Sequence, residues 1–507
     1  MSAISGIPEG GTEERKSPRL SIEVRDFGPI ASGSITLKPL TVFVGPNNSG
    51  KSYAAMLIHS VFESYAPSLW TRHVPRFMRE SFFEEIDTRR YLERFPDLGK
   101  RIDELEPGGQ FELPDQLVQD VSRQILSEVC ERRLRRELVR SFASPLEELT
   151  RIGTSSFELN IDANSHGIRL RYQEGRLTLQ DYAKPDFRIG VKLVQEPDSF
   201  MRWNPDARLI EIGTGWREIP KEIGVQFMVD QVMRLVSAMC AREMLQGIAM
   251  PCYYLPAARS GILQGHRQLA ASIVQKAPLF GIEPIEIPPF SGVVADFISS
   301  IITLPEEEGP FLDLAQTFEQ ELIKGEIVVR ALDERRYPEI SYSLQGTEIP
   351  LHRSSSSVSE LAPLFLYLKY RVEPDSVLII EEPEAHLHPE NQRIMAKLLV
   401  RLVRRNVNVV ITTHSEYLVE QLNSFILLSK IEAEERVRRY QYDEEDFLQI
   451  DEVGAHVFTY DAESGGHRIS ELEMTEEDGI SQQEFMRVHE VLYEETLKLR
   501  MDQSSDT

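Results

Sequence analysis

Gly45-Pro-Asn-Asn-Ser-Gly-Lys51-Ser52 is the stretch that decides the fold of this chain. The apolar run Leu40–Val44 precedes it, and residues 53–58 follow with the composition of a helix. Strand, glycine-rich loop and helix form the context in which a G-x-x-x-x-G-K-[ST] pattern marks a phosphate-binding loop. The sequence therefore predicts a nucleotide site at this loop. The alternative is a plain glycine-rich turn between two elements.

Each residue type in this loop has a chemical role in holding a nucleotide. Backbone N–H groups of the loop and of the following helix N-terminus would surround the phosphates. Lys51 would reach the β- and γ-phosphates, and the Ser52 hydroxyl would bind Mg²⁺. The predicted nucleotide-binding set is Gly45, Pro46, Asn47, Asn48, Ser49, Gly50, Lys51 and Ser52.

The composition is that of an acidic globular chain. Its 507 residues carry a formal net charge of −25, from 56 basic and 81 acidic side chains. This balance disfavours a general role in coating nucleic acid, although a local basic groove stays open, and it suits a basic protein partner. Cys130, Cys240 and Cys252 show no paired spacing, which fits the reducing cytoplasm.

Neither a membrane span nor a signal peptide is expected. The most apolar long segment, residues 227–250, contains Asp230, Arg234, Arg242 and Glu243, so it is interpreted as a buried amphipathic helix. Residues 1–18 are rich in Gly, Ser and Glu, and we expect a disordered lead-in there.

The pattern along the chain changes several times. Alternating apolar residues predict antiparallel strands near 20–24 and 33–37, and short strands are expected again around 436–442 and 456–460. The expected domains are the lead-in 1–18, an N-terminal lobe 19–70, a helical and β insertion 71–250, a C-terminal lobe 251–430 and a C-terminal extension 431–507.

A second informative block begins with Ser376-Val-Leu-Ile-Ile380, a continuous apolar run typical of a central strand buried on both faces. It ends in Glu381 and Glu382, and adjacent carboxylates at such a place are costly without a role. In a strand they point to opposite sides. We assign Glu381 to the Mg²⁺ shell and Glu382 to positioning or activating the attacking water. A charged strand-to-turn junction is the alternative.

Two further segments supply candidate phosphate contacts. The apolar run 406–413 ends in His414, which would hydrogen-bond a γ-phosphate or precede a helix start at Ser415. The serine-rich stretch 354–360 opens a helix, with Ser357 and Glu360 in the spacing of a capping box. A hydroxyl-rich helix N-terminus is also a phosphate-binding surface, so Ser357 and Ser359 are candidates for that role.

Taken together, these motifs resemble the ABC-type ATPase heads of the RecF, SMC and OLD kind. Residues 45–52 look like Walker A, 377–382 like Walker B, 384–389 like the D-loop, and His414 like the switch histidine. Residues 354–360 occupy the place of the signature motif but lack its Leu-Ser-Gly-Gly-Gln pattern. A Q-loop glutamine is not identified. Tyr254-Leu-Pro-Ala-Ala-Arg-Ser260 also resembles an element of the OLD-like branch, which implies that Arg259 lies near the nucleotide.

The resemblance implies a fold and a mechanism. The fold class would be α/β: a P-loop ABC-type ATPase head with a parallel-sheet core, an antiparallel β subdomain and a large helical and β insertion. Two heads would dimerise head-to-tail and sandwich ATP and Mg²⁺ between the phosphate loop of one and the signature serines of the other. ATP would then act as a switch that favours the closed dimer.

The resemblance also limits the output of such a switch. The chain has no D-x-D pattern of the kind a Toprim nuclease needs. It therefore looks like a stand-alone ATPase, similar to the sensor subunits of bacterial antiphage systems such as PARIS or Septu. By that analogy a separate nuclease or toxin would be the effector, and DNA or a phage protein the trigger.

The alternative function is a DNA-repair clamp of the RecF type that binds DNA directly. The net charge argues against it, although the basic run 132–136 could supply a local patch. That run is otherwise interpreted as the solvated face of a helix.

Overall fold

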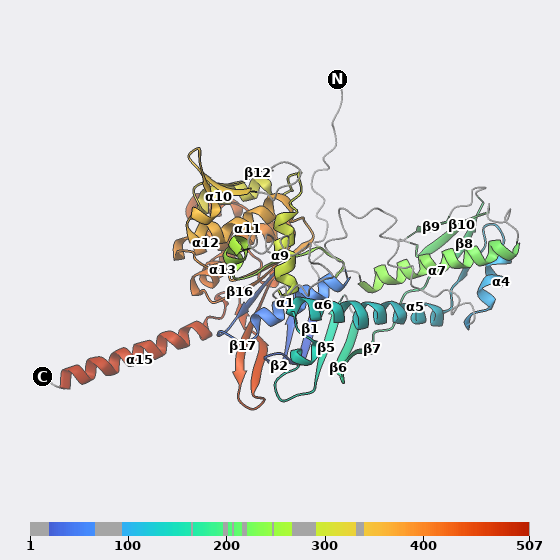
Figure 1. The fold of residues 1–507 in the computed structure, drawn as a ribbon, viewed down its shortest axis with the longest axis horizontal. Coiled ribbons are helices and arrows are strands. Elements are labelled where there is room, and N and C mark those ends of the chain that lie inside the picture. The colour runs from blue at the N-terminus through green and yellow to red at the C-terminus, as the bar shows by residue number, and fades with distance from the viewer. Residues whose placement is uncertain are drawn as a thin grey trace, which may run out of the picture.

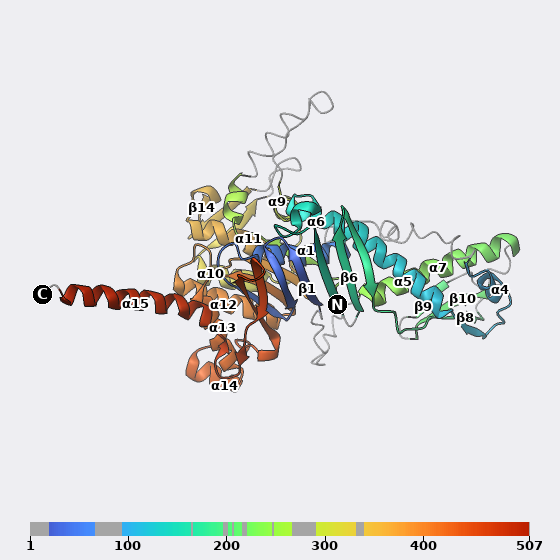
Figure 2. The ribbon, with the colours of Figure 1, turned by 90° about the horizontal axis from the view of Figure 1, so that it is seen from below.

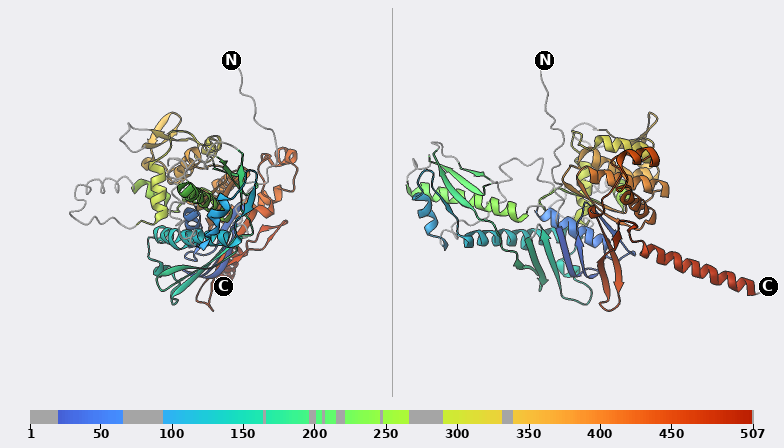
Figure 3. Two further views of the ribbon diagram at one scale, coloured as in Figure 1. Left: turned by 90° about the vertical axis from the view of Figure 1, so that its right-hand side faces the viewer. Right: turned by 180° about the vertical axis from the view of Figure 1, so that it is seen from behind.

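A computed structural model describes residues 20–65, 94–163, 166–195, 201–204, 207–214, 221–245, 248–265, 290–330 and 339–505. The predicted lead-in 1–18 and the beginning of the predicted insertion, residues 71–93, lie outside these ranges. The described part has a central body, an arm on one side and the helix α15 (Gln483–Ser505) projecting on the other (Figure 1). Figures 2 and 3 show the same separation from other directions.

One large mixed sheet organises the body. Its eleven described strands form a mainly parallel half and a mainly antiparallel half. In spatial order they are β11 (Cys252–Leu255), β15 (Ser376–Glu381), β16 (Val407–Thr413), β3 (Leu40–Val44), β17 (Val453–Asp461), β18 (Gly466–Glu471), β2 (Ile30–Thr36), β1 (Leu20–Phe27), β5 (Ser156–Ala163), β6 (His166–Gln173) and β7 (Arg176–Tyr182).

The half of the sheet that carries the predicted motifs is parallel. Strand β3 pairs in parallel with β16 on one side and β17 on the other, and β15 pairs in parallel with β16 and β11. Alternate residues of β15 enter different cores: Val377 and Ile379 pack on one face of the sheet, and Leu378 and Ile380 on the other. This double burial explains the continuous apolar run. The carboxyl ends of β3, β16 and β15 consequently meet at one edge.

Helices cover both faces of the parallel half. Helix α1 (Lys51–Tyr65) contributes to the core that contains Phe43, and it lies against β11, β15 and β16. The opposite face is covered by a group of helices in the C-terminal half of the chain (Figure 1). They are α10 (Leu312–Leu322), α11 (Ser356–Tyr370), α12 (Pro389–Arg404) and α13 (Glu416–Leu428).

The antiparallel half of the sheet is built from hairpins. β1 and β2 pair as predicted, and β5, β6 and β7 continue the sheet beyond β1. β5 to β7 come from the segment expected to be an insertion, whereas β17 and β18 come from the segment expected to be a C-terminal extension. Both segments therefore contribute strands to the main sheet.

The arm is formed by helices and a small sheet. Its helices are α4 (Asp97–Asp103), α5 (Asp115–Ser127) and α7 (Lys221–Leu245), the last of which matches the helix predicted over 227–250. Its strands are β4 (Gln110–Glu112), β8 (Gly190–Val194), β10 (Leu209–Gly213) and β9 (Met201–Asn204). A π-helical segment, η3 (Glu128–Leu134), joins α5 to α6 (Arg135–Phe142) and packs on α1.

The remaining described elements complete the fold. They are η4 (Leu146–Leu149), α9 (Gly292–Ile302), β12 (Glu326–Arg330), β13 (Glu339–Leu344), β14 (Thr347–Pro350), η7 (Leu351–Arg353), α14 (Ala433–Glu435), η8 (Arg436–Tyr440), η9 (Ile450–Glu452), β19 (Met474–Thr475) and β20 (Gly479–Ile480). The predicted α/β fold class, with a parallel core, an antiparallel β part and a helical and β insertion, is confirmed.

The strand predicted around 436–442 was wrong. Residues 436–440 form the helical turn η8. The Arg436 guanidinium stacks over the Phe447 ring, 4.4 Å from its centroid, and donates a hydrogen bond to Leu428 O at 3.2 Å. These tertiary contacts, which local propensity does not contain, hold the segment against α13.

No helix within the described ranges combines the length and the apolar character needed to span a lipid bilayer.

Candidate functional site

The predicted phosphate loop connects β3 to α1 and has the backbone that its glycines require. Gly45 has φ +145° and Gly50 has φ +103°, where other residues are strained. A Cβ atom on Gly45 would lie 2.6 Å from Phe458 O, and one on Gly50 would lie 2.9 Å from Ile30 Cγ1. Both glycines are therefore needed for the close approach of the loop to β17 and β2.

Lys51 lies inside this loop. Its Nζ donates hydrogen bonds to Gly45 O at 2.9 Å and Pro46 O at 2.7 Å, and its side chain is buried. Burial lowers the pKa of Lys51 to about 8, and the carboxylates of Glu382, Glu384 and Glu381 oppose this shift. The loop thus holds a desolvated cation where a phosphate would bind.

A cavity of about 820 Å³ opens beside the loop, within the size range of ligand sites. Residues 47–53 and a second group, Glu382, Thr412 and His414, contribute to its lining. The other lining residues are Gly28, Pro29, Glu148, Thr150 and Ile152. The second group comes from the carboxyl ends of β15 and β16. Strand pairing therefore assembles the cavity from segments that are far apart in the sequence.

Glu382 has an unusual backbone at the point where β15 ends. Its φ is +44°, in the left-handed region that a residue with a side chain rarely adopts. Its N–H donates to Thr412 O at 2.9 Å and to Thr412 Oγ1 at 3.2 Å. Such outliers persist only where surrounding contacts determine them, and they concentrate at functional sites.

Glu384 joins the same two strand ends. One of its carboxylate oxygens accepts hydrogen bonds from Thr413 Oγ1 and from His414 N, both at 2.8 Å. Burial raises the pKa of Glu384, whereas these hydrogen bonds lower it. Thr412 was assigned no role from the sequence, and Glu384 was placed only at the start of the segment that resembles the D-loop. The signal available was a carboxylate just after one apolar strand and two threonines at the end of the next.

His414 follows β16 and is held through its backbone. Burial lowers the pKa of its imidazole, and the nearby Lys51 charge adds to that effect, while Glu382 opposes it. The imidazole is therefore neutral near pH 7, when one ring nitrogen donates a hydrogen bond and the other accepts one.

The structure brings Glu382 to the cavity but does not bring Glu381 there. Glu381 is 7% exposed, and its Oε2 accepts a hydrogen bond from Ala257 N at 3.1 Å. The two carboxylates thus lie on different sides of the strand end, as the alternation of a strand requires. The Mg²⁺ role of Glu381 stays a prediction, and in this structure its side chain faces the turn after β11.

The serine-rich start of α11 differs from its predicted form. Ser355 is the N-cap, and its Oγ accepts a hydrogen bond from Val358 N, so the expected capping box of Ser357 with Glu360 is wrong. Ser357 is half-buried, whereas Ser359 is buried and donates to Leu351 O at 3.1 Å. Neither serine lines the cavity of its own chain.

Arg259 is also outside the lining of the cavity. Its side chain is 1% exposed and contacts backbone carbonyls at the end of β15. It therefore lies behind the acidic strand end, and its expected place near the nucleotide stays a prediction.

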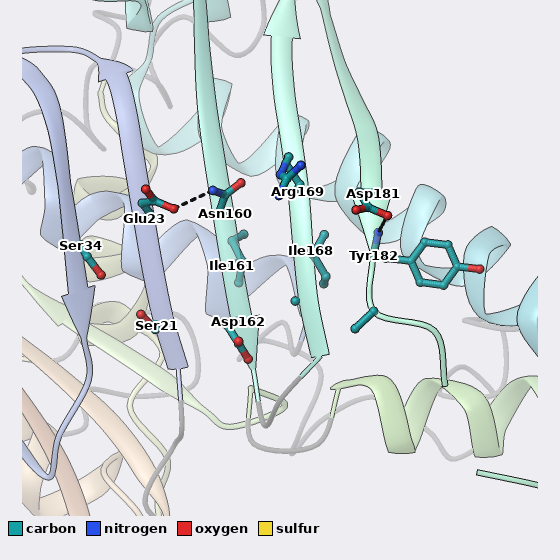
Figure 4. A pocket seen from close by; sticks show the side chains of 12 residues that line it. Ser21, Glu23, Ser34, Asn160, Ile161, Asp162, Ile168, Arg169, Asp181 and Tyr182 are labelled. Atoms are coloured by element: carbon teal, nitrogen blue, oxygen red, sulfur yellow. Dashed lines mark hydrogen bonds between the residues drawn. The ribbon is translucent and has the colours of Figure 1, made fainter. Parts of the chain in front are cut away.

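The antiparallel half of the sheet carries a different hollow (Figure 4). It measures about 490 Å³, and the side chains around it include Glu23, Asn160, Arg169 and Asp181. Asn160 Nδ2 donates to Glu23 Oε2 at 2.7 Å across β1 and β5. None of the predicted site residues lines this hollow, so the phosphate-loop cavity is the candidate site.

The residues of that cavity fit a phosphate group with a divalent cation. The first N–H groups of α1 have no partner within the helix, and the Ser49 hydroxyl is buried without a hydrogen-bond partner. Donors therefore converge on the loop, while Glu382 lines the same cavity and its carboxylate acts on the Lys51 charge. A phosphate between them would be repelled by Glu382 unless a cation such as Mg²⁺ lay nearby, within reach of the Ser52 hydroxyl.

Comparison with known proteins finds a family similarity for one part of the chain. Residues 300–419, which include α11, β15, α12 and β16, match the family model described as an AAA ATPase domain. This part of the chain is therefore similar to an ATPase domain. No curated protein matches the chain.

Three solved structures are similar at low identity. A Smc head bound to the C-winged helix domain of ScpA is 10% identical, with 90% of this chain and 98% of that chain covered and a TM-score of 0.38. A Smc head with an extended coiled coil, bound to the C-terminal domain of ScpA derived from Pyrococcus furiosus, is 12% identical, covers 94% and 99%, and scores 0.38. The SMC head domain from Thermotoga maritima is 12% identical, covers 90% and 100%, and scores 0.33. These TM-scores do not establish a shared fold.

Proposed function

We propose that this chain is an ABC-type ATPase that hydrolyses ATP and acts as a switch for a separate effector protein. One observation carries the proposal: the phosphate loop, Glu382 and His414 line the same cavity. Loop donors on one side and a carboxylate on the other are the arrangement needed to hold a phosphate and direct water at it.

Each residue has a stated part in the proposed reaction. Lys51 and the N-terminus of α1 bind the β- and γ-phosphates. The Glu382 carboxylate accepts a hydrogen bond from the attacking water and orients it. The neutral His414 imidazole donates a hydrogen bond to the γ-phosphate, and Glu384 fixes the His414 backbone. Mg²⁺, held by the Ser52 hydroxyl and in our proposal by Glu381, would neutralise charge on the phosphates.

A second copy would complete the site. The start of α11 carries Ser355 and Ser356 exposed to solvent and Ser357 half-exposed, at a helix N-terminus that favours anions. In a head-to-tail dimer these hydroxyls would contact the nucleotide bound to the other copy. The buried Ser359 would then stabilise the helix start without touching ATP.

The hydrolysis proposal is tested by phosphate release from ATP. Glu382→Gln should lower kcat by about 100-fold or more, because it removes the carboxylate but keeps its shape. Glu390→Gln is the matched control, since Glu390 is an exposed carboxylate of the same segment outside the cavity. Equal rates for Glu382→Gln and the wild type would contradict the proposal.

The proposed role as a switch for a separate effector is tested in cells. We expect a nuclease or toxin encoded beside this chain to be held or released according to the nucleotide state, with DNA or a phage protein as the trigger. Phage plating on cells that carry the whole locus should show protection, and Lys51→Ala should abolish it. Tight DNA binding by the isolated chain with a steep salt dependence would instead favour the DNA-repair clamp.

A further inference from the structure

Arg259 follows β11 and makes a buried cluster of contacts with the end of the acidic strand. Its Nη1 donates to Glu381 O at 2.8 Å and to Pro256 O at 3.2 Å. Its Nη2 approaches Glu382 O at 3.3 Å. One guanidinium therefore holds the carbonyls of both acidic residues, through several donors with fixed geometry.

These contacts act on the residue with the unusual backbone. β16 holds the N–H of Glu382 through Thr412, and Arg259 holds its carbonyl oxygen from the other side. The left-handed φ of +44° is thus fixed at both peptide groups. Because that backbone sets the direction of the Glu382 side chain, loss of one support would let the carboxylate turn away from the phosphate loop.

The same guanidinium also binds the start of α11. Arg259 Nε donates to Glu360 O at 3.0 Å and lies 3.1 Å from Glu360 Oε1 as an ion pair. Both side chains of the pair are 1% exposed. Glu360 is three residues after Ser357, so Arg259 connects the helix start that would contact a second copy with the residue that would orient water in its own cavity.

We infer that Arg259 is a positioning residue that holds Glu382 in its left-handed conformation and ties it to the N-terminal end of α11. The inference rests on the proposed function, because it depends on the role given to Glu382. It predicts that Arg259 matters for turnover but not for nucleotide affinity, since the phosphate loop is built from β3 and α1.

The experiment replaces the ion pair as a unit. Arg259→Met with Glu360→Gln removes both charges together, because removing the arginine alone would leave a buried carboxylate unpaired. The matched control is Lys369→Met with Glu319→Gln. That pair is also buried, at 2.9 Å, and Lys369 lies near the other end of α11, where its Nζ donates to Ile327 O.

Three quantities are measured for each variant: kcat for ATP hydrolysis, the Kd of a fluorescent ATP analogue, and the melting temperature. We expect the Arg259 and Glu360 double variant to lose about 10-fold or more in kcat with Kd changed by less than about threefold. The control pair should keep kcat despite a similar change in melting temperature. Arg259→Lys with Glu360 intact should recover only part of the rate, because an ammonium cannot hold all of these acceptors in the fork geometry.

The outcomes separate the inference from the proposed function. A wild-type rate in the double variant, or an equal loss of rate in the control pair, overturns the inference. If the double variant does not fold, Arg259→Lys decides, and a wild-type kcat for it overturns the inference. Failure of the proposed function is seen separately, as absence of an effect of Glu382→Gln.

Discussion

At the scale of single residues, the site depends on charges that are taken out of water. Lys51 is buried among loop carbonyls and faces Glu382 across the cavity. Two effects therefore act on its ammonium: burial disfavours the charged form, and the carboxylates favour it. Burial has the larger effect on the pKa, so the Lys51 ammonium loses its proton more readily than a lysine in water. A bound phosphate would reverse that balance.

The pH dependence of stability follows from the lowered pKa of Lys51. This pKa is about 8, against an ordinary value of 10.5 for lysine. Between these values the unfolded chain binds more protons, so the wild type gains stability as the pH rises. We expect wild type to gain about 2 kcal/mol relative to Lys51→Met from pH 8 to 10.5, less than the full shift implies because the loop is near solvent. Denaturant unfolding at both pH values measures this gain, and a constant difference would contradict it.

At the scale of elements, the position of β18 depends on a close approach to β2. Gly33 on β2 faces Ile469 on β18, where the two strands pair in parallel. A Cβ on Gly33 would lie 2.8 Å from both Ile469 N and Ile469 O. Those atoms belong to the backbone and cannot turn aside as a side chain does. β17 and β18 connect the phosphate-loop strand to the antiparallel half of the sheet.

Substitution of this glycine should therefore weaken the junction of the two halves. We expect Gly33→Ala to lower the free energy of unfolding by about 1–3 kcal/mol, because the new methyl group forces the backbones apart. Gly167→Ala is the control, since Gly167 is also in a strand and a Cβ there meets no atom within 4 Å. Thermal or denaturant unfolding compares the two, and equal stability would show that the strands move without cost.

At the scale of the whole molecule, the phosphate-loop cavity and the serines at the start of α11 are separate features of one chain. The loop, Glu382 and His414 come from one chain, whereas the exposed serines at the start of α11 do not line its own cavity. Within one chain, the serines proposed as the signature therefore lie outside the phosphate-loop cavity. This is the structural reason for expecting ATP to join two copies.

Nucleotide-dependent association tests this expectation. With Mg²⁺ and ATP, Glu382→Gln should accumulate as a dimer, because binding is retained while hydrolysis is slow. Adding Ser357→Arg should prevent the dimer, since a bulky cation would occupy the shared surface, yet leave ATP binding to the phosphate loop intact. Light scattering after size-exclusion chromatography measures both. A monomer in every nucleotide state would exclude the ATP sandwich.

The sequence alone determined the phosphate loop, its flanking elements, the central strand before Glu381 and Glu382, and the α/β class. These features are local: a strand buried on both faces must be apolar throughout, and a loop that wraps a phosphate needs glycines at fixed spacings.

The tertiary structure decided which side chains meet. Strand pairing placed Glu382 and His414 opposite Lys51, while Glu381 faces the turn after β11. It also placed Arg436 in a helical turn where a strand was predicted, and it buried Arg259 behind the end of β15. Such outcomes depend on partners distant in the sequence, because side-chain direction, burial and pairing are set by packing across the sheet and not by neighbours along the chain.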